Sequence, residues 1–184
     1  MKEGIRIIGG KFRGKKIPVL DAPDLRPTPA RVRETLFNWL GHKVNQSRCL
    51  DAFAGSGLLG LEALSRGASK VTLIEHSLAA YRHLKKIGSA FEHHDIDIFH
   101  QDSLQFIAGS ALKYDIIFLD PPFESTLLYQ VMDLIASSDI LAEDAVVYTE
   151  SSEPIRPGSW WVELKNKKAG QVYYGLYRKN VDTK

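Results

Sequence analysis

The tetrapeptide Asp120-Pro121-Pro122-Phe123 places an acid, two prolines and an aromatic ring directly after an apolar run, Tyr114–Leu119, that predicts a buried strand. Asp120 and the carbonyl of Pro121 can each accept one hydrogen of an exocyclic amino group. The prolines stiffen the turn because their rings fix φ, and Phe123 can lie flat on a nucleobase. We therefore take Asp120, Pro121 and Phe123 as candidate catalytic residues. The competing interpretation is a rigid loop whose acid only caps the next helix.

A second expected strand, residues 47–52, runs into a glycine-rich turn. The sequence Gly55-Ser56-Gly57-Leu58-Leu59-Gly60 matches the G-x-G-x-x-G pattern of nucleotide-binding turns. Glycines let the backbone turn sharply and approach a ligand closely. Asp51 puts an anion just before the turn, which suits the cationic sulfonium and α-amino group of S-adenosylmethionine and suits a pyrophosphate poorly. The candidate cofactor-binding residues of this turn are Asp51, Phe53, Gly55 and Gly57.

Two more acids follow expected strands. Glu75 ends the strand at 70–75, where it can accept hydrogen bonds from both hydroxyls of a ribose. Asp102 follows the strand at 95–99, where it can accept from an adenine amino group or cap the next helix, and both roles stay open. Nicotinamide enzymes share the glycine pattern, but no Tyr/Lys or His/Asp pair that could handle a hydride is evident in the sequence.

Taken together, the two turns predict methyl transfer from S-adenosylmethionine to the amino group of a base. Such an amino nitrogen is a poor nucleophile, because its lone pair is delocalised into the ring. Acceptors at Asp120 and at the Pro121 carbonyl favour a pyramidal nitrogen whose lone pair points at the methyl group. Asp120 can later take the released proton. The base must leave its stack to reach these groups.

Short apolar runs alternate with amphipathic stretches from residue 47 onward. Strands are expected at 47–52, 70–75, 95–99, 114–119 and 144–149, and helices at 57–66, 77–89, 102–112 and 125–137. This alternation predicts an α/β protein with a Rossmann-like, mostly parallel sheet. In such sheets ligands bind at the carboxyl ends of the strands, near the point where the strand order reverses. The strands at 47–52 and 114–119 should flank that point, so the two motifs should face each other.

The two ends of the chain differ from the middle. Ser159–Asn166 and Gln171–Arg178 read as a hairpin, so the sheet should finish with antiparallel strands. Ile5–Gly9 and Lys15–Val19 can pair as a small hairpin. After a polar linker, Thr28 is expected to cap a helix that starts at Pro29 and runs to about Leu40. We therefore expect a basic N-terminal hairpin extension over 1–25 and a catalytic domain over 26–184.

Length and composition bound the class of protein. The chain has 184 residues and 44% hydrophobic content, which suits one large domain with a substantial core. It has no run of 18 apolar residues and no signal-peptide pattern at its start. The single cysteine, Cys49, excludes an intrachain disulfide and favours a reducing compartment. We expect a cytoplasmic, monomeric protein with no membrane partner, and the histidines have no ligand spacing that would predict a metal site.

Charge is distributed unevenly around a net value of +2. Residues 1–33 carry +6 and residues 156–184 carry +5, whereas residues 34–155 carry −9. Basic ends around an acidic middle favour contact with a polyanion, although solvated surface lysines would give the same count. The candidate RNA-binding residues are Arg6, Lys11, Arg13, Lys15, Arg31 and Arg33. These side chains would follow phosphates, and Phe12 among them could stack on a base.

The chain resembles the RsmD family, bacterial enzymes that methylate the N2 amine of a guanine in 16S ribosomal RNA. The resemblance rests on residues 5–14, residues 26–37, Leu50–Gly60 and Asp120–Phe123. It implies a seven-stranded methyltransferase fold, S-adenosylmethionine as the methyl donor, and 16S rRNA presented on small-subunit particles. By matching motif, Asp51, Gly55, Gly57, Glu75 and Asp102 would hold the cofactor, and Asp120 and Phe123 the target base.

Three rival functions remain at this stage. Methylation of adenine N6 in DNA or RNA would use the same tetrapeptide. A non-catalytic ribosome-assembly factor would bind RNA through the same basic residues. A nicotinamide-dependent dehydrogenase would use the same glycine turn.

Overall fold

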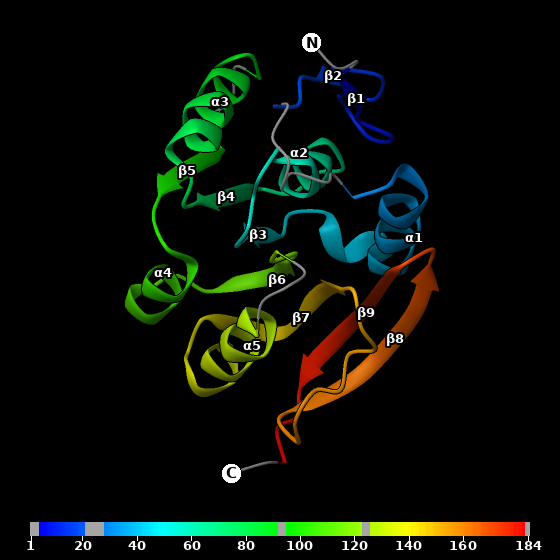
Figure 1. The fold of residues 1–184 in the computed structure, drawn as a ribbon, viewed down its shortest axis with the longest axis vertical. Coiled ribbons are helices and arrows are strands. Elements are labelled where there is room, and N and C mark those ends of the chain that lie inside the picture. The colour runs from blue at the N-terminus through cyan, green and yellow to red at the C-terminus, as the bar shows by residue number, and fades with distance from the viewer. Residues whose placement is uncertain (1–3, 21–27, 92–94, 123–125, 183–184) are drawn as a thin grey trace.

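The computed structural model describes residues 4–20, 28–91, 95–122 and 126–182. Its centre is a seven-stranded sheet in the order β5-β4-β3-β6-β7-β9-β8 (Figure 1). The strands are β3 (Arg48–Asp51), β4 (Lys70–Glu75), β5 (Ile96–His100), β6 (Tyr114–Leu119), β7 (Leu141–Ser151), β8 (Trp161–Ala169) and β9 (Val172–Lys179). β3 to β7 are parallel, and β9 runs antiparallel to β7 and β8. The predicted fold, including the terminal antiparallel hairpin, is confirmed.

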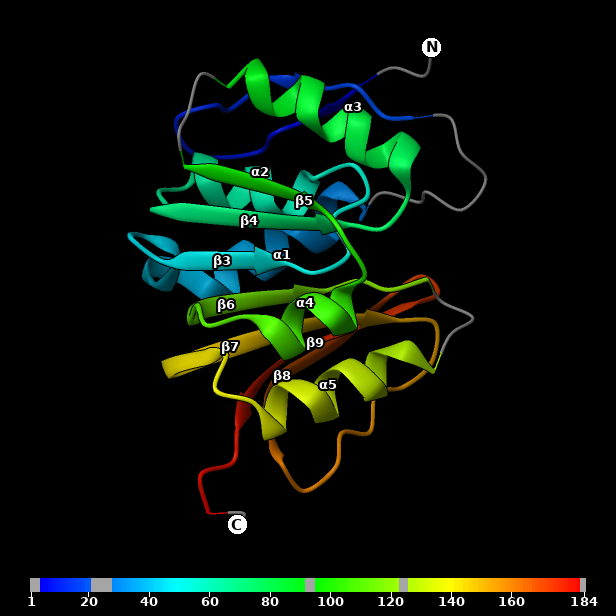
Figure 2. The same cartoon turned by 90° about the vertical axis from the view of Figure 1, so that its left-hand side faces the viewer.

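Helices cover both faces of the sheet. The α-helices are α1 (Ala30–Leu40), α2 (Leu58–Ser65), α3 (Leu78–Ser89), α4 (Ser103–Gly109) and α5 (Leu127–Ser137), and a short 3-10 helix (Gly41–Val44) follows α1. Figure 2 shows α4 and α5 in front of the sheet and α1 and α2 behind it. Within the described residues, no helix combines the length and apolar character needed to cross a bilayer.

Alternate residues of each strand serve the two faces, because successive side chains of a strand point in opposite directions. Cys49 and Phe118 belong to the core under α1, α2 and α3, whereas Leu50 and Ile117 belong to the core under α4 and α5. Every one of these four side chains is buried. The parallel strands are therefore apolar on both faces, as expected for a sheet between two layers of helices.

A small hairpin precedes the main sheet and shares its core. It consists of β1 (Ile5–Arg6) and β2 (Lys16–Ile17), which pair antiparallel as predicted. Ile7 and Ile17 are each 1% exposed and join the core under α1 and α2. The described part of the extension is thus packed onto the catalytic fold. The proposed division at residue 25 falls outside the described residues and stays a prediction.

The start of α1 differs from the prediction. Pro29 occupies the N-cap position without a side-chain hydrogen bond, and the helix begins at Ala30. The Thr28 hydroxyl, expected to cap the helix, donates instead to the carboxylate of Glu150. A capping hydroxyl accepts from a backbone N–H, whereas the Thr28 hydroxyl is oriented as a donor toward the carboxylate of Glu150 on β7. The end of α1 is as expected, with Gly41 at the C-cap with a φ of 52°.

Topology brings the two predicted motifs to one edge of the sheet. β3 pairs with β4 on one side and with β6 on the other, so the strand order reverses between β3 and β6. The glycine turn leaves the carboxyl end of β3, and Asp120 leaves the carboxyl end of β6. The ligand-binding position of an open α/β sheet therefore lies between them.

The third glycine of the turn is needed for packing. A Cβ at Gly60 would lie 2.8 Å from Cγ1 of Val71 and would also overlap Leu73, because α2 packs closely on β4. Gly60 has ordinary helical backbone angles, so the constraint is one of space. Gly109, at the end of α4, has no atom within 4 Å of such a Cβ.

We predict that Gly60→Ala lowers the free energy of unfolding by about 1–3 kcal/mol through overpacking. Gly109→Ala is the matched control and should be neutral or slightly stabilising, because alanine favours helix. Urea denaturation of both variants measures the difference. Equal stability of the two variants would contradict the close packing of α2 on β4.

Candidate active site

Three acids meet at the carboxyl ends of three neighbouring strands, β3, β6 and β7. Asp51 is paired with Phe118, so Asp120 lies two residues further along the adjacent strand. Leu119 is paired with Thr149, which puts Asp120 beside Glu150. Among the described residues, no lysine, arginine or histidine forms an ion pair with any of the three acids. This edge of the sheet therefore gathers three acids that have no cationic partner in the part of the chain that the structure describes.

Asp51 lies at the bottom of the site and is 2% exposed. Its Oδ2 accepts a hydrogen bond from the backbone N–H of Gly60 at 3.1 Å, which ties the end of β3 to the first turn of α2. Burial, followed by the nearby charges of Glu75 and Glu150, raises the pKa of Asp51 to about 7. A cationic ligand placed here would favour the ionised carboxylate.

Asp120 is partly exposed and shares a hydrogen-bond network with Glu150, which is 2% exposed. The Thr28 hydroxyl lies 2.8 Å from Oε1 of Glu150 and 3.4 Å from Oδ2 of Asp120. The Tyr148 hydroxyl donates to the same Glu150 oxygen at 3.0 Å. Burial and the neighbouring charges of Glu150 and Asp51 raise the pKa of Asp120 well above its usual value. Burial raises the pKa of Glu150 to about 7.

The glycine turn is held to the end of β4 by Glu75. Its Oε2 accepts from the N–H of Gly55 at 2.9 Å, and its Oε1 accepts from the N–H of Ser77 at 2.7 Å. Gly57 adopts a φ of 75° at the start of α2, in the left-handed region that favours glycine. A Cβ there would also lie 2.8 Å from Cδ2 of Leu84. Glu75 thus fixes the turn and borders the same edge of the sheet.

The loop after β5 completes this edge. Asp102 caps α4 by accepting from the N–H of Gln105 at 3.0 Å, so the capping alternative is observed. A carboxylate has several acceptor positions, so capping leaves room for a ligand amino group. The Ser103 hydroxyl donates to the carbonyl of Ala52 and thereby joins this loop to the glycine turn. Phe53, in the same turn, is partly exposed and packs against the core under α4 and α5.

The other residues of the tetrapeptide differ in burial, and one of them lies outside the described residues. Pro121 is buried and Pro122 is exposed. The predicted base-stacking residue, Phe123, lies outside the described residues. Within those residues, no group of three or more His, Cys, Asp or Glu side chains is arranged to hold a metal ion.

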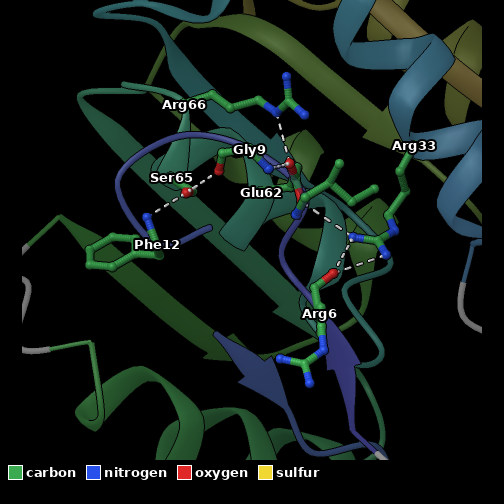
Figure 3. Close-up of polar contacts among 8 residues, drawn as sticks. Arg6, Gly9, Phe12, Arg33, Glu62, Ser65 and Arg66 are labelled. Carbon is green, nitrogen blue, oxygen red and sulfur yellow. Dashed lines mark hydrogen bonds and ion pairs between the residues drawn. The ribbon is translucent and has the colours of Figure 1, made fainter. Parts of the chain in front are cut away.

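A buried carboxylate, Glu62 of α2, anchors the N-terminal segment (Figure 3). It is 0% exposed and accepts from the N–H groups of Ile8 and Gly9 at 2.8 and 2.9 Å. It also pairs with Arg33 at 3.2 Å and with Arg66 at 2.7 Å. Two cations and two backbone donors therefore balance one buried charge.

Arg33 does not fit its predicted role in RNA binding. Its side chain is 1% exposed, and its guanidinium donates to the carbonyl of Arg6 as well as to Glu62. The demand of buried Glu62 for a cation holds this arginine inside the fold. We therefore correct its role from phosphate contact to attachment of the N-terminal segment to α1 and α2.

The other predicted RNA-binding residues lie on the surface. Arg6, Lys11, Arg13 and Arg31 are exposed, and Lys15 is half-buried. The Lys15 ammonium donates to the carbonyl of Ala90 at 2.6 Å and lies 3.9 Å from the centre of the Phe91 ring. Phe12 packs edge-to-face on Phe91 at 5.0 Å, which accounts for its ring without a bound base.

Comparison with known proteins gives a consistent result. A family model described as "Conserved hypothetical protein 95" matches residues 5–178. Ribosomal RNA small subunit methyltransferase D of Escherichia coli K12 is 44% identical over 95% of this chain and 90% of its own length. The protein of the same name from Haemophilus influenzae is 43% identical over 96% of this chain and 95% of its own length.

The chain belongs to this family. The solved structure of yhhF from Escherichia coli, 43% identical, has a TM-score of 0.87 and covers 96% of this chain and 98% of that one. A solved structure from Haemophilus influenzae, 40% identical, has a TM-score of 0.83 over the same shares. The resemblance to the RsmD family is therefore confirmed, and the family fold extends from β1 to β9.

Sequence reasoning gave no role at this site to Thr28, Ser103 or Glu150, although Thr28 was named as a helix cap. It also missed Glu62, which anchors the N-terminal segment. Glu150 carried the same signal as Asp51 and Glu75, an acid at the end of an apolar strand, but the expected strand stopped at residue 149. Glu62 is the one acid in the otherwise apolar helix α2, which was a signal for a buried charge.

We predict that Glu62→Gln lowers the free energy of unfolding by about 3 kcal/mol, because Arg33 is left as an uncompensated buried charge. The matched control is Glu34→Gln on the exposed face of α1, where a change within about 0.5 kcal/mol is expected. Chemical denaturation measures both. A loss of stability no greater than that of the control would contradict the anchoring role of Glu62.

Proposed function

We propose that this protein transfers a methyl group from S-adenosylmethionine to the N2 amine of a guanine in 16S rRNA of the small ribosomal subunit. The observation that carries the proposal is the meeting of the Asp51 glycine turn and the Asp120 tetrapeptide at neighbouring strand ends. Membership of a family whose relatives are named ribosomal RNA small subunit methyltransferase D supports the same substrate class. A ribosomal substrate would place the protein in the cytoplasm.

The residues at the strand ends fit the proposed cofactor. When bound, S-adenosylmethionine supplies an electrophilic methyl group on a sulfonium. Asp51, a buried acid without a cationic partner among the described residues, would compensate the positive charges of the methionyl part. Phe53, Gly55 and Gly57 would form the cradle, and Glu75 would accept from the ribose hydroxyls. Asp102 would accept from the adenine amino group.

Asp120 would orient the target amine. It is the one partly exposed acid of the three, so a flipped base can reach it while Glu150 stays covered. Hydrogen bonds from the amine to Asp120 and to the Pro121 carbonyl would direct the nitrogen lone pair at the methyl group. We place Phe123 against the base on the strength of the sequence motif alone.

The exposed basic residues Arg6, Lys11, Arg13 and Arg31, together with Lys15, would contact phosphates. They flank the segment that Glu62 anchors, so their backbone is held before RNA arrives. Pre-ordered contacts lose less entropy on binding.

The direct test uses S-adenosylmethionine labelled in its methyl group. Four substrates are compared: small-subunit particles that lack the modification, naked 16S rRNA, naked duplex DNA and large-subunit RNA. The proposal expects label in the particles, released on digestion as N2-methylguanine. Label recovered in adenine would contradict guanine methylation and indicate methylation of adenine N6. Binding to the subunit without any label would contradict an enzymatic role and indicate an assembly factor.

We predict that Asp120→Ala lowers turnover by on the order of a hundredfold or more, because the amine loses a positioned acceptor. Binding of S-adenosylhomocysteine, measured by calorimetry, should stay within about threefold of the wild type, because Asp120 faces the base rather than the cofactor. Near-full turnover in this variant would overturn the role given to Asp120.

For the RNA surface, we predict that Arg13→Ala weakens particle binding and lowers the slope of log K against log salt by about one. Lys113→Ala is the control, because Lys113 is exposed just before the amino end of β6, at the opposite edge of the sheet. Filter binding over a range of salt concentrations measures both. Equal slopes for the two variants would show that Arg13 does not contact the RNA phosphates.

A further inference from the structure

Asp120 and Glu150 are two carboxyl groups joined through a single hydroxyl. Thr28 Oγ1 lies between them, 2.8 Å from Glu150 and 3.4 Å from Asp120. Thr28 is 5% exposed and Glu150 is 2% exposed, so bulk water does not effectively screen Glu150 or the hydroxyl that joins it to the partly exposed Asp120. Within residues 4–20, 28–91, 95–122 and 126–182, the other titratable groups that face the pair are Asp51 on β3 and Tyr148 on β7, and neither brings a positive charge.

Two neighbouring carboxylates in such a setting cannot both keep a full negative charge. The hydrogen bonds indicate which one is ionised. Thr28 and Tyr148 both reach Oε1 of Glu150, so that oxygen accepts two donors, as a carboxylate does. Among the described residues, Asp120 has only the longer contact to Thr28. The arrangement matches an ionised Glu150 beside a neutral, protonated Asp120.

We propose that Asp120, Thr28 and Glu150 act as one unit in which the two carboxyls share a single proton and Thr28 relays protons between them. This inference rests on the proposed function, because it concerns the proton that the methylated amine must lose. Glu150 and Thr28 are positioning and relay residues, whereas Asp120 touches the amine.

The proton balance requires such a relay. Methylation forms a nitrogen–carbon bond and breaks a carbon–sulfur bond whose electrons stay on sulfur, so the new amine carries one proton too many. A neutral Asp120 cannot simply add it. The amine proton passes to one oxygen of Asp120 as the acid proton of Asp120 moves to Thr28 Oγ1. The Thr28 hydroxyl proton then moves to Oε1 of Glu150, and the pair ends with two protons that return to water after product release.

The resting protein gives a test that is independent of methyl transfer. Infrared difference spectra are recorded at about pH 9, well above the pKa of about 7 of Asp51. A neutral carboxylic acid band is expected in the wild type. It should be lost in both Asp120→Asn and Glu150→Gln, because a shared proton needs both partners, and retained in Thr28→Val. Absence of the band in the wild type, or its persistence in both carboxyl variants, overturns the inference.

Turnover gives the second readout. Asp120→Asn keeps a neutral acceptor oxygen but can neither take the amine proton nor pass one on, so it should lower kcat by on the order of a hundredfold. Glu150→Gln and Thr28→Val should lower kcat by a similar factor with KM for the particle little changed, and Thr28→Ser should restore it. Near-wild-type kcat in Glu150→Gln or in Thr28→Val would overturn the relay. If the wild type transfers no methyl group at all, the proposed function fails, whatever the infrared result.

Discussion

The parallel pairing of β3, β6 and β7 forces their carboxyl ends to one edge of the sheet, and each of these strands has an acid at its last residue or next to it. Asp51, Asp120 and Glu150 are therefore held near one another by backbone hydrogen bonds, whatever their mutual repulsion. Without cationic partners among the described residues, Asp51 and Glu150 are stabilised by hydrogen bonds from a backbone N–H group and from hydroxyls. The same features make the edge attractive to a cationic cofactor and to an amine.

The buried carboxylate of Glu62 differs from these acids, because its charge is compensated by cations. Glu62 is compensated by Arg33 and Arg66 and by two backbone donors, so it is fully balanced and its role is structural (Figure 3). It attaches the N-terminal segment to the catalytic fold. One chain thus buries acids in two ways. The balanced one holds the basic N-terminal segment in place, and the unbalanced ones lie at the edge of the sheet where we propose that ligands bind.

The predictable part of the molecule was the part in which local signals agree with the tertiary structure. Apolar runs ended by acids or glycines located every strand of the parallel sheet, and the G-x-G-x-x-G spacing located the turn at Gly55 and Gly57. Two roles were left open for Asp102, helix cap and acceptor for an adenine amino group, and the structure shows the cap. Thr28 was misassigned because its position before Pro29 is typical of a cap, and only the approach of β7 supplied a better partner. Arg33 was misassigned because nothing in its neighbourhood reveals Glu62, which is far along the chain.

By itself, the sequence determined the order of strands and helices, the two motifs and the chemistry that those residue types favour. This is because strand and helix periodicity and glycine turns are encoded within a few residues. Only the tertiary structure decided which charges are buried together, namely Arg33 with Glu62 and Asp120 with Glu150. Burial and pairing depend on residues far apart in the chain, and they set whether an arginine faces RNA or the core and whether an acid holds its proton.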